Sequence, residues 1–229
     1  SSDLAQDGEA ATPLILAQAP QLLAHGRAQV VTAWIQQIPQ ERVASTPWLM
    51  YWQGICQQFV NPFEARATLE RVYSSFVAEQ DVMGQLMTAS AIIDIVWFLR
   101  ESLFSTVRWV EVLQKYLATH LNFPSPAAEA RLLTSLFSVV MYMQPQDSEL
   151  HRYAERLTAL LEGDLNVNQK MMMGAQLINY YVQIEGDIVT CDRIIMLLDG
   201  LLSAPELSAV TQIISRQFAA LPHLLAGRD

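Results

Sequence analysis

The stretch 47-PWLMYWQGICQQFVNPFEARATLERVYSSF-76 decides the fold class of this chain. Large apolar side chains recur in it at steps of three and four residues, which places them on one face of a helix. They are Trp48, Tyr51, Trp52, Ile55 and Phe59 before Asn61-Pro62, and Ala65, Leu69, Val72 and Phe76 after it. The stretch contains no recognisable catalytic group, so its aromatic content indicates packing. We predict an antiparallel helical hairpin closed by a short turn.

Prolines mark where several helices begin. Thr46-Pro47, Asn61-Pro62 and Ser125-Pro126 each place a good N-cap residue before a proline at the first helical position, where its missing N–H costs nothing. Glu64 follows Asn61 by three residues, which completes a pattern like a capping box. These signals predict helices that begin at residues 47, 62 and 126.

The hairpin recurs along the chain. Further helices are expected near residues 13–25, 27–38, 81–102, 104–121, 126–143, 148–162, 166–185, 187–202 and 205–220. Corresponding starts at Pro47, Asp81, Pro126 and Leu165 lie about 34 to 45 residues apart, the range of helix-pair solenoids. No strand-like alternation competes with this pattern.

The fold class that follows is all-α. We expect a right-handed superhelix of antiparallel helical hairpins, a TPR-like α-solenoid of about ten or eleven helices. A single helical-repeat domain is predicted over residues 11–229, after a disordered or vector-derived N-terminus at residues 1–10. Because the chain lacks an initiator methionine, we expect it to be a piece of a longer protein.

Composition limits the classes of partner. Hydrophobic residues make up 52% of the chain and charged residues only 16%, against about 25% in ordinary domains, so much helical surface must be buried. Apolar runs such as 91-AIIDIVWFL-99 are broken by Asp94, and none approaches the roughly 18 to 20 uninterrupted residues of a membrane span. We therefore expect a soluble, cytoplasmic protein that does not contact a membrane.

Charge and cysteine usage agree with that location. The net charge is −9, and the two lysines, Lys115 and Lys170, and twelve scattered arginines form no basic stripe, so direct nucleic-acid binding is not expected. Cys56 and Cys191 lie far apart without CxxC spacing, which indicates small buried residues in a reducing compartment. The first ten residues have no signal-peptide pattern.

Known catalytic and metal-binding patterns do not occur in the sequence. The four histidines, His25, His120, His151 and His223, fall in different predicted hairpins and form no HExxH, HxH or His/Cys cluster. No GxSxG or GxGxxG motif occurs. We predict no enzyme activity, no metal and no cofactor. The alternative is a stand-alone helical enzyme with a site between hairpins, for which Asp94 and His120 are the first candidates.

Three predicted first-of-pair helices carry a polar stripe at the same spacing. The stripes are Ser90, Asp94, Trp97 and Glu101; Arg131, Ser135, Ser138 and Tyr142; and Met172, Gln176, Asn179 and Gln183. Asp94 interrupts an apolar helix and needs a partner or water, because an unpaired buried carboxylate is costly. Since first helices usually line the concave surface of a solenoid, we predict that the stripes form one groove for a ligand, a peptide or another domain. The alternative is that the stripes merely face solvent and bind nothing.

The runs 22-LLAHGRAQVVTAWIQQIP-39, 47-PWLMYWQG-54 and 62-PFEARATLERVYSSF-76 carry a family resemblance. A leucine pair, Gly-Arg, Trp-Ile-x-x-Ile-Pro, Pro-Trp-Leu and Ala-Arg-x-x-Leu-Glu follow one another in them. This pattern resembles the MalT-like helical-repeat region of large LuxR-type bacterial transcription regulators, over roughly the first 100 residues. The resemblance implies a sensor segment placed between a nucleotide-binding module and a C-terminal helix-turn-helix.

Two features of those regulators are missing from the sequence. It has no GxxxxGK[ST] loop, and 219-AALPHLLAGRD-229 is not a DNA-reading helix-turn-helix. ATP use and DNA binding are therefore not expected of this chain. The resemblance favours a non-enzymatic sensor or scaffold that binds a protein partner, other domains of the same regulator or a small effector. A homo-oligomer through an uncapped last helix, with Ile213, Ile214, Phe218 and Leu221, is also considered.

Overall fold

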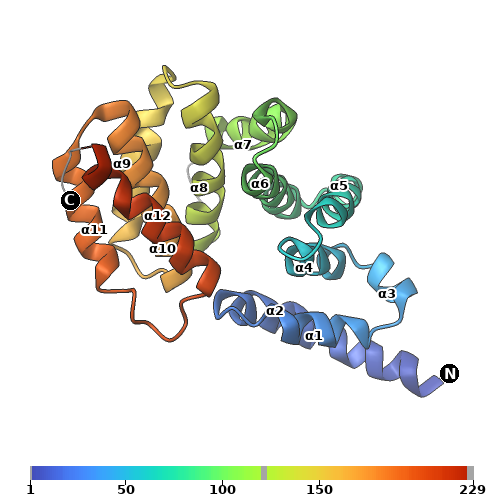
Figure 1. Cartoon of the computed structure of the whole chain (residues 1–229). Coiled ribbons are helices and arrows are strands. Elements are labelled where there is room, and N and C mark those ends of the chain that lie inside the picture. Colours follow the sequence, from blue (N-terminus) through green and yellow to red (C-terminus); the bar gives the residue numbers. More distant parts are fainter. Residues whose placement is uncertain (1, 120–122, 226–229) are drawn as a thin grey trace. The chain divides into compact units, whose positions relative to one another are not determined.

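A computed structural model describes residues 2–119 and 123–225, with side chains for 11–119, 123–209 and 211–220 (Figure 1). Every regular element in this described part is a helix, so the all-α prediction is confirmed. The residue contacts divide into two compact units, Ser1–Leu113 and Gln114–Asp229, where the sequence predicted a single domain over 11–229.

The first unit contains the helices that precede the division. They are α1 (Ser2–Ala24), α2 (Ala28–Gln36), α3 (Gln40–Ala44), α4 (Pro47–Gln57), α5 (Pro62–Ala78), α6 (Val82–Leu99) and the short 3₁₀ helix η1 (Leu103–Thr106). Helix α7 (Val107–Thr119) crosses the division. Helix α3 was not predicted, and α1 is longer than the helix expected near 13–25.

The second unit continues the sequence of helices. They are α8 (Pro126–Met143), α9 (Ser148–Leu161), α10 (Val167–Tyr180), the π-helical turn η2 (Tyr181–Glu185), α11 (Ile188–Asp199) and α12 (Ala209–Leu225). The segment predicted as one helix over 166–185 thus ends in a π turn. The last helix begins four residues later than expected.

Two of the three predicted caps are confirmed. The Asn61 side chain accepts a hydrogen bond from the Glu64 backbone N–H at 3.3 Å, and Ser125 accepts one from the Ala128 backbone N–H at 3.2 Å. Thr46 occupies the N-cap position of α4, but its side chain makes no capping bond there. Proline at the first helical position therefore marks the start of α4 without the help of a side-chain cap.

Helices α4, α5 and α6 form the centre of the first unit. The Trp48 indole N–H donates to Asp81 at 2.9 Å, which joins the starts of α4 and α6, and the Phe59 and Phe98 rings meet at 5.5 Å near the ends of both helices. Helices α4 and α6 are therefore parallel, and α5 returns antiparallel to them. A Cβ on Gly84 would lie 2.4 Å from the Phe76 ring, so α5 and α6 approach closely only because glycine is there.

The aromatic residues of the stretch 47–76 differ in burial. Tyr51, Trp52, Tyr73 and Phe76 are buried, and Trp48 packs against Tyr51, Trp52 and Phe76 with ring centroids 4.9 to 6.2 Å apart. This confirms packing as their purpose. Phe59 differs, because α4 ends at Gln57 and leaves it 54% exposed beyond the predicted helical stripe.

The second unit repeats the hairpin arrangement. Gln169 donates to the Ala127 carbonyl at 3.0 Å, and the Ser208 backbone N–H donates to Asn168 at 2.9 Å, so the starts of α8, α10 and α12 lie together. Ser215 also donates to the Met171 carbonyl at 3.3 Å further along α12. The three helices therefore run parallel, with α9 and α11 as the returning helices. Antiparallel hairpins are thus observed in both units, while a continuous right-handed superhelix stays a prediction.

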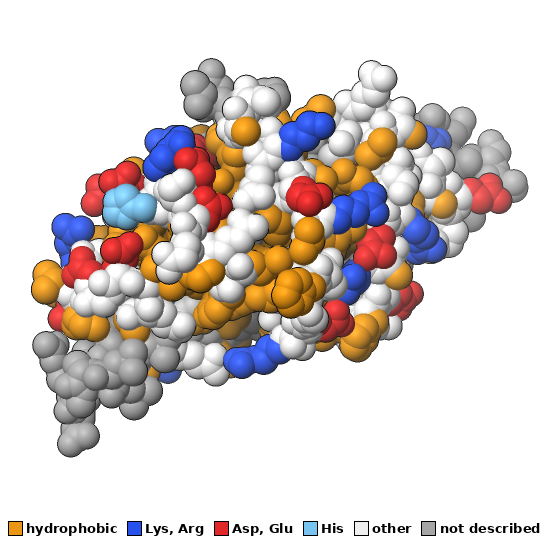
Figure 2. All heavy atoms as spheres, turned by 90° about the horizontal axis from the view of Figure 1, so that it is seen from above, with side chains coloured by type: hydrophobic (Ala, Val, Ile, Leu, Met, Phe, Trp, Pro, Cys, Tyr) orange, Lys and Arg blue, Asp and Glu red, His pale blue; other side chains and the backbone are white. Residues whose placement is uncertain are grey.

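Helix α6 qualifies the expectation about membranes. Over Val82–Leu99 it has a mean hydropathy of 1.7, so its length and composition alone are sufficient for a membrane span despite Asp94. In the structure 56% of this stretch is buried, and it packs against α5 and α4. We interpret it as the core helix of the first unit. Figure 2 shows that many hydrophobic side chains remain on the face in view, among scattered charged ones, in keeping with the low charge content.

Candidate functional site

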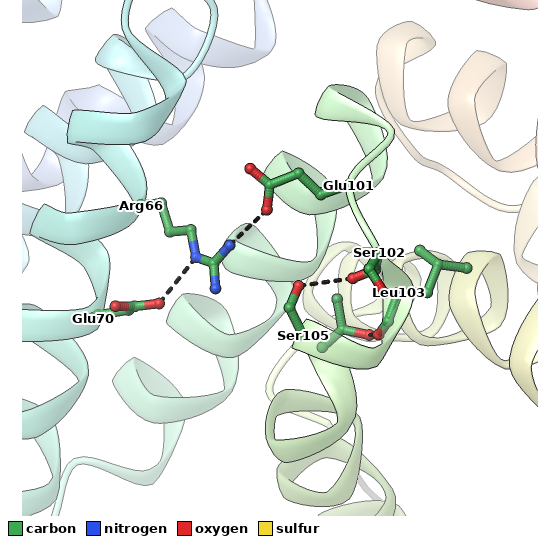
Figure 3. A network of polar contacts seen from close by, with 7 residues as sticks. Arg66, Glu70, Glu101, Ser102, Leu103 and Ser105 are labelled. Carbon is green, nitrogen blue, oxygen red and sulfur yellow. Dashed lines mark hydrogen bonds and ion pairs between the residues drawn. The ribbon is translucent and has the colours of Figure 1, made fainter.

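The stripe on α6 is partly internal to the first unit. Ser90 is fully buried and donates to the Met87 carbonyl at 2.9 Å, while Asp94 and Trp97 are half-buried. Glu101 lies beyond the end of the helix, after Arg100, whose φ is 52°. There it accepts a charge-assisted hydrogen bond from Arg66 at 2.8 Å, and Arg66 also contacts Glu70 at 3.0 Å (Figure 3).

The stripe on α8 is largely enclosed. Ser135 and Ser138 are buried and return their hydroxyls to their own helix, donating to the carbonyls of Arg131 at 3.2 Å and Ser135 at 2.8 Å. Such back-bonding satisfies a buried hydroxyl without any external ligand. Arg131 is half-buried, and Tyr142 is 41% exposed. Tyr142 is thus the outermost member of this stripe.

The stripe on α10 contains two buried amides. Asn179 is fully buried, and Gln176 is 2% exposed. The Gln176 carbonyl oxygen has no hydrogen-bond partner, although it is enclosed. Met172 is half-buried, and Gln183, in the π turn, is exposed. Burial of two amides in one helix is unusual, because each needs partners to offset the loss of water.

The structure joins the α8 and α10 stripes through Asn179. Its amide nitrogen donates to the Tyr142 hydroxyl at 2.6 Å and lies 3.9 Å from the Met141 sulfur. Its amide oxygen accepts a hydrogen bond from Gln183. We call Tyr142, Asn179 and Gln183 the polar rail. The prediction that these two stripes lie side by side agrees with this contact.

The prediction that all three stripes line an open groove is wrong for the residues that are buried. Five of the twelve stripe residues are buried: Ser90, Ser135, Ser138, Gln176 and Asn179. These side chains face other atoms of their own unit, because parallel first helices pack against one another as well as against their return helices. They are neither solvent-facing nor lining an open surface. Among the α8 and α10 candidates, the exposed members are Tyr142 and Gln183.

Next to the rail, the π turn assembles a second polar cluster that the sequence did not reveal. A π turn brings residues five apart onto one face, and here the Tyr180 hydroxyl donates to Glu185. Burial and the Glu185 carboxylate raise the pKa of Tyr180 above its ordinary range. His151 from α9 lies between Glu155, at 3.4 Å, and Glu185, at 3.8 Å.

This π turn had only one signal in the sequence. Gly186, which ends it with a φ of 66°, marks a helix terminus, but a glycine does not tell whether the last turn is α or π. Similarly, Glu129 on α8 was not singled out, although its buried carboxylate binds Arg156 of α9 through two hydrogen bonds at 2.5 and 2.8 Å. The Glu129 bond raises the pKa of Arg156.

The two cysteines have the properties of structural residues. Cys191 is buried, and burial raises its thiol pKa to about 11. Burial also raises the pKa of the half-buried Cys56, against a smaller opposing effect of a hydrogen bond with Thr32. A raised pKa keeps a thiol protonated and unreactive at neutral pH.

Apart from His151, neither the described histidines nor the described surface depression brings functional groups from different helices together. His25 is exposed and contacts the Gln21 carbonyl near the end of α1, His120 lies outside the described residues, and so does the His223 side chain. Among the described residues, no group of His, Cys, Asp or Glu could hold a metal ion. The depression recorded on the surface is lined by exposed residues of α5 alone, namely Glu64, Ala67, Glu70, Arg71 and Ser74.

Comparison of the chain with family models, with curated proteins and with solved structures finds no match. The MalT-like resemblance therefore stays a prediction from the residues that carry it.

Proposed function

We propose that the chain is a non-enzymatic helical-repeat interaction module, in which the second unit binds a peptide segment or a small polar effector on the polar rail. The observation that supports this most is the state of Asn179. Its amide is fully buried, yet its nitrogen and its oxygen each hold an exposed side chain: the nitrogen holds Tyr142 and the oxygen holds Gln183. A polar surface held from behind by a buried group is preorganised, which lowers the ordering cost of binding.

The chemistry of the rail suits a neutral hydrogen-bonding ligand. The carboxamide of Gln183 is exposed and offers an acceptor oxygen, and the Tyr142 ring adds a partly exposed apolar face. Neither side chain carries a charge at neutral pH. Backbone amides, carboxamides and sugars present the matching donors and acceptors.

The wider role that we propose is signal reception in a bacterial regulatory protein. The support for it is the MalT-like pattern of residues 22–39, 47–54 and 62–76, together with the hairpins in both units. Ligand binding would favour one arrangement of the hairpins over another, by no more than the difference in affinity between the two arrangements. The enzyme alternative with Asp94 and His120 gains no support, since His120 lies outside the described residues.

A thermal-shift screen of sugars, metabolites and short peptides tests the proposal. A ligand that binds only the folded chain must raise its melting temperature. We expect a hit to raise the melting temperature of the wild-type chain. Gln183→Ala and Tyr142→Phe should each need at least about fivefold more ligand for the same rise, which corresponds to roughly one lost hydrogen bond.

The matched control is Gln217→Ala, which removes an exposed glutamine from α12 of the same unit. This variant should respond to the hit as the wild-type chain does. A ligand whose stabilising effect is unchanged in both rail variants would show that the rail is not the binding site.

A further inference from the structure

An exposed aromatic patch in the first unit has no role in the core or in the polar rail. We define the aromatic patch as Phe59, Val60, Phe63, Phe98 and Phe104, which are 54%, 87%, 67%, 50% and 82% exposed. Four phenylalanines at half exposure or more in one region are unusual, because isolated apolar side chains, not clusters, are the normal surface feature.

The members of the patch come from four segments at one end of the unit: the turn after α4, the first turn of α5, the last turn of α6 and η1. Phe59 and Phe98 form an edge-to-face pair at 5.5 Å, which connects the end of α4 with the last turn of α6. Phe63 lies in the first turn of α5, one helical turn before Arg66. Arg66 in turn binds Glu101, three residues after Phe98 and three before Phe104 (Figure 3). The patch therefore lies close to an ion pair.

The unit does not need these side chains for its own packing. Its interior is filled by others, among them Tyr51, Phe76, Leu69 and Ile92, each fully or almost fully buried. A fully exposed phenylalanine offers about 150–250 Å², so the patch presents roughly 500 Å² of apolar area. An area of this size lies in the range of about 300–600 Å² that the largest apolar patch of a monomer reaches, and such patches are often functional.

From these observations we propose that the aromatic patch is a homodimer interface, occupied by the same patch of a second copy of this chain. Charges of both signs lie beside it, since Arg66 is paired with Glu70 and with Glu101. A two-fold axis places each side chain of such a surface against another member of the same set, so a border of mixed sign is self-complementary. A partner of one dominant charge would be better matched by a border of the opposite sign.

The expected dimer is weak. Two copies of the patch would bury roughly 1,000 Å² in total, at the lower limit for a specific interface. The net charge of −9 on each chain opposes association, and salt screens this repulsion while leaving apolar contact intact. Dimerisation should therefore strengthen with salt, the opposite of an interface held by ion pairs. This inference is independent of the proposed ligand site, which lies in the other unit.

Sedimentation analysis of the intact chain tests it between about 1 and 100 µM protein, at about 50 and 500 mM salt. The mass should rise with concentration from 25.7 kDa towards twice that value, and more readily at high salt. Phe63→Glu and Phe104→Glu should raise the dimer dissociation constant at least about tenfold, since each places a charge in the apolar contact.

Met196→Glu and Ile213→Glu are matched controls, because these side chains are 70% and 59% exposed in the second unit. They should leave the dimer intact. Circular dichroism melting must show that all four variants fold, which their exposure favours. A chain that stays monomeric throughout, or a dimer broken by Ile213→Glu and not by Phe63→Glu, overturns the proposal; the second result would assign the contact to the last helix.

Cross-linking gives a second readout, which traps a dimer that is only weakly populated. Val60→Cys and Val189→Cys replace side chains of similar exposure, 87% and 80%, in the patch and on α11. A short bis-maleimide should link two copies of the Val60→Cys chain and few of the Val189→Cys chain. The native thiols give little background, since burial raises the pKa of both. Equal linking of the two variants contradicts the patch as the interface.

Discussion

The two units bury different chemistry. The first holds all five tryptophans of the chain, at positions 34, 48, 52, 97 and 109, and its central helices meet through aromatic rings. The second has no tryptophan, and it buries instead the amides of Gln176 and Asn179 and the carboxylate of Glu129. The hydrophobic burial of rings is largely non-directional, whereas each buried polar group fixes its neighbours by hydrogen bonds. The comparison teaches that the polar second unit is the better place to orient a ligand, and the apolar first unit the better place for an extended contact.

The largest effect is expected from the aromatic core of the first unit. Phe76→Ala should lower the free energy of unfolding by about 3–5 kcal/mol, because the ring is fully buried between Trp48 and Gly84 and leaves a cavity. Tryptophan fluorescence during denaturation reports on the first unit alone, while far-ultraviolet circular dichroism reports on both. If the units are energetically separate, the fluorescence transition should move more than the dichroism transition.

Phe63→Ala is the control for that variant, since its ring is 67% exposed. Its unfolding free energy should change by less than about 0.5 kcal/mol. A Phe76→Ala chain as stable as this control would contradict an aromatic core, and identical shifts in both signals would show that the two units unfold together.

The second unit should depend instead on its polar interior. Asn179→Leu keeps the branched shape, with bulkier methyl groups, but removes the hydrogen bonds with Tyr142 and Gln183, and we expect a loss of about 2 kcal/mol. Gln176→Met should have the opposite sign, a gain of about 1 kcal/mol, because it removes a buried carbonyl oxygen that has no partner. Denaturant unfolding followed by circular dichroism measures both. If both substitutions destabilise equally, the two amides do not differ in the way the structure shows.

A close helix approach in the first unit gives a smaller effect. Gly84→Ala would place a methyl group 2.4 Å from the Phe76 ring, so the clash should outweigh the gain in helix propensity and cost about 1–2 kcal/mol. Gly200→Ala is the matched control in the second unit, where the nearest atom would be 3.7 Å away. Calorimetric melting should show destabilisation only in the first variant. A stabilised Gly84→Ala chain would mean that α5 and α6 can separate without penalty.

Effects of similar or smaller size are expected at the helix caps, and they too distinguish the two units. Asp81→Ala removes the bond to the Gly84 N–H at 2.8 Å and also the bond from Trp48 at 2.9 Å. Asp187→Ala removes only local bonds, to the Thr190 backbone N–H at 3.0 Å and its hydroxyl at 2.5 Å. We expect a loss of about 1–2 kcal/mol for the first variant and about 1 kcal/mol or less for the second. Equal losses would show that the Trp48 bond adds nothing.

The contribution of Asp187 should depend on pH. Its hydrogen bonds with Thr190 lower the pKa of its carboxyl in the folded chain. A depressed folded-state pKa stabilises the chain above the unfolded-state pKa of about 4, and that stability is lost as the pH falls through the folded-state value. The melting-temperature difference between the wild-type chain and Asp187→Ala should therefore be constant at neutral pH and shrink below about pH 4. A difference that grows in acid would contradict the sign of this shift.

Most of the local structure was accessible from the sequence because its causes are local. The starts of α5 and α8 follow from Asn61-Pro62 and Ser125-Pro126, whose caps act within three residues. The apolar spacing predicted the hairpin of α4 and α5, and the alternation of such hairpins predicted an all-helical chain. The candidate site was foreseen only as adjacent stripes. Which members are enclosed depends on the packing of neighbouring helices, and no spacing rule contains that information.

The sequence by itself determined most of the helices, the first residues of α4, α5 and α8, and the pairing of α4 with α5, since backbone hydrogen bonding and side-chain period act over a few residues. Tertiary structure decided the rest. It buried Asn179 beside Tyr142, turned the end of α10 into a π turn, divided the contacts into two units and left Phe59 and Phe63 exposed. Burial depends on the surfaces that distant segments present to one another, so identical apolar residues, such as Phe63 and Phe76 of one helix, end on opposite sides of it.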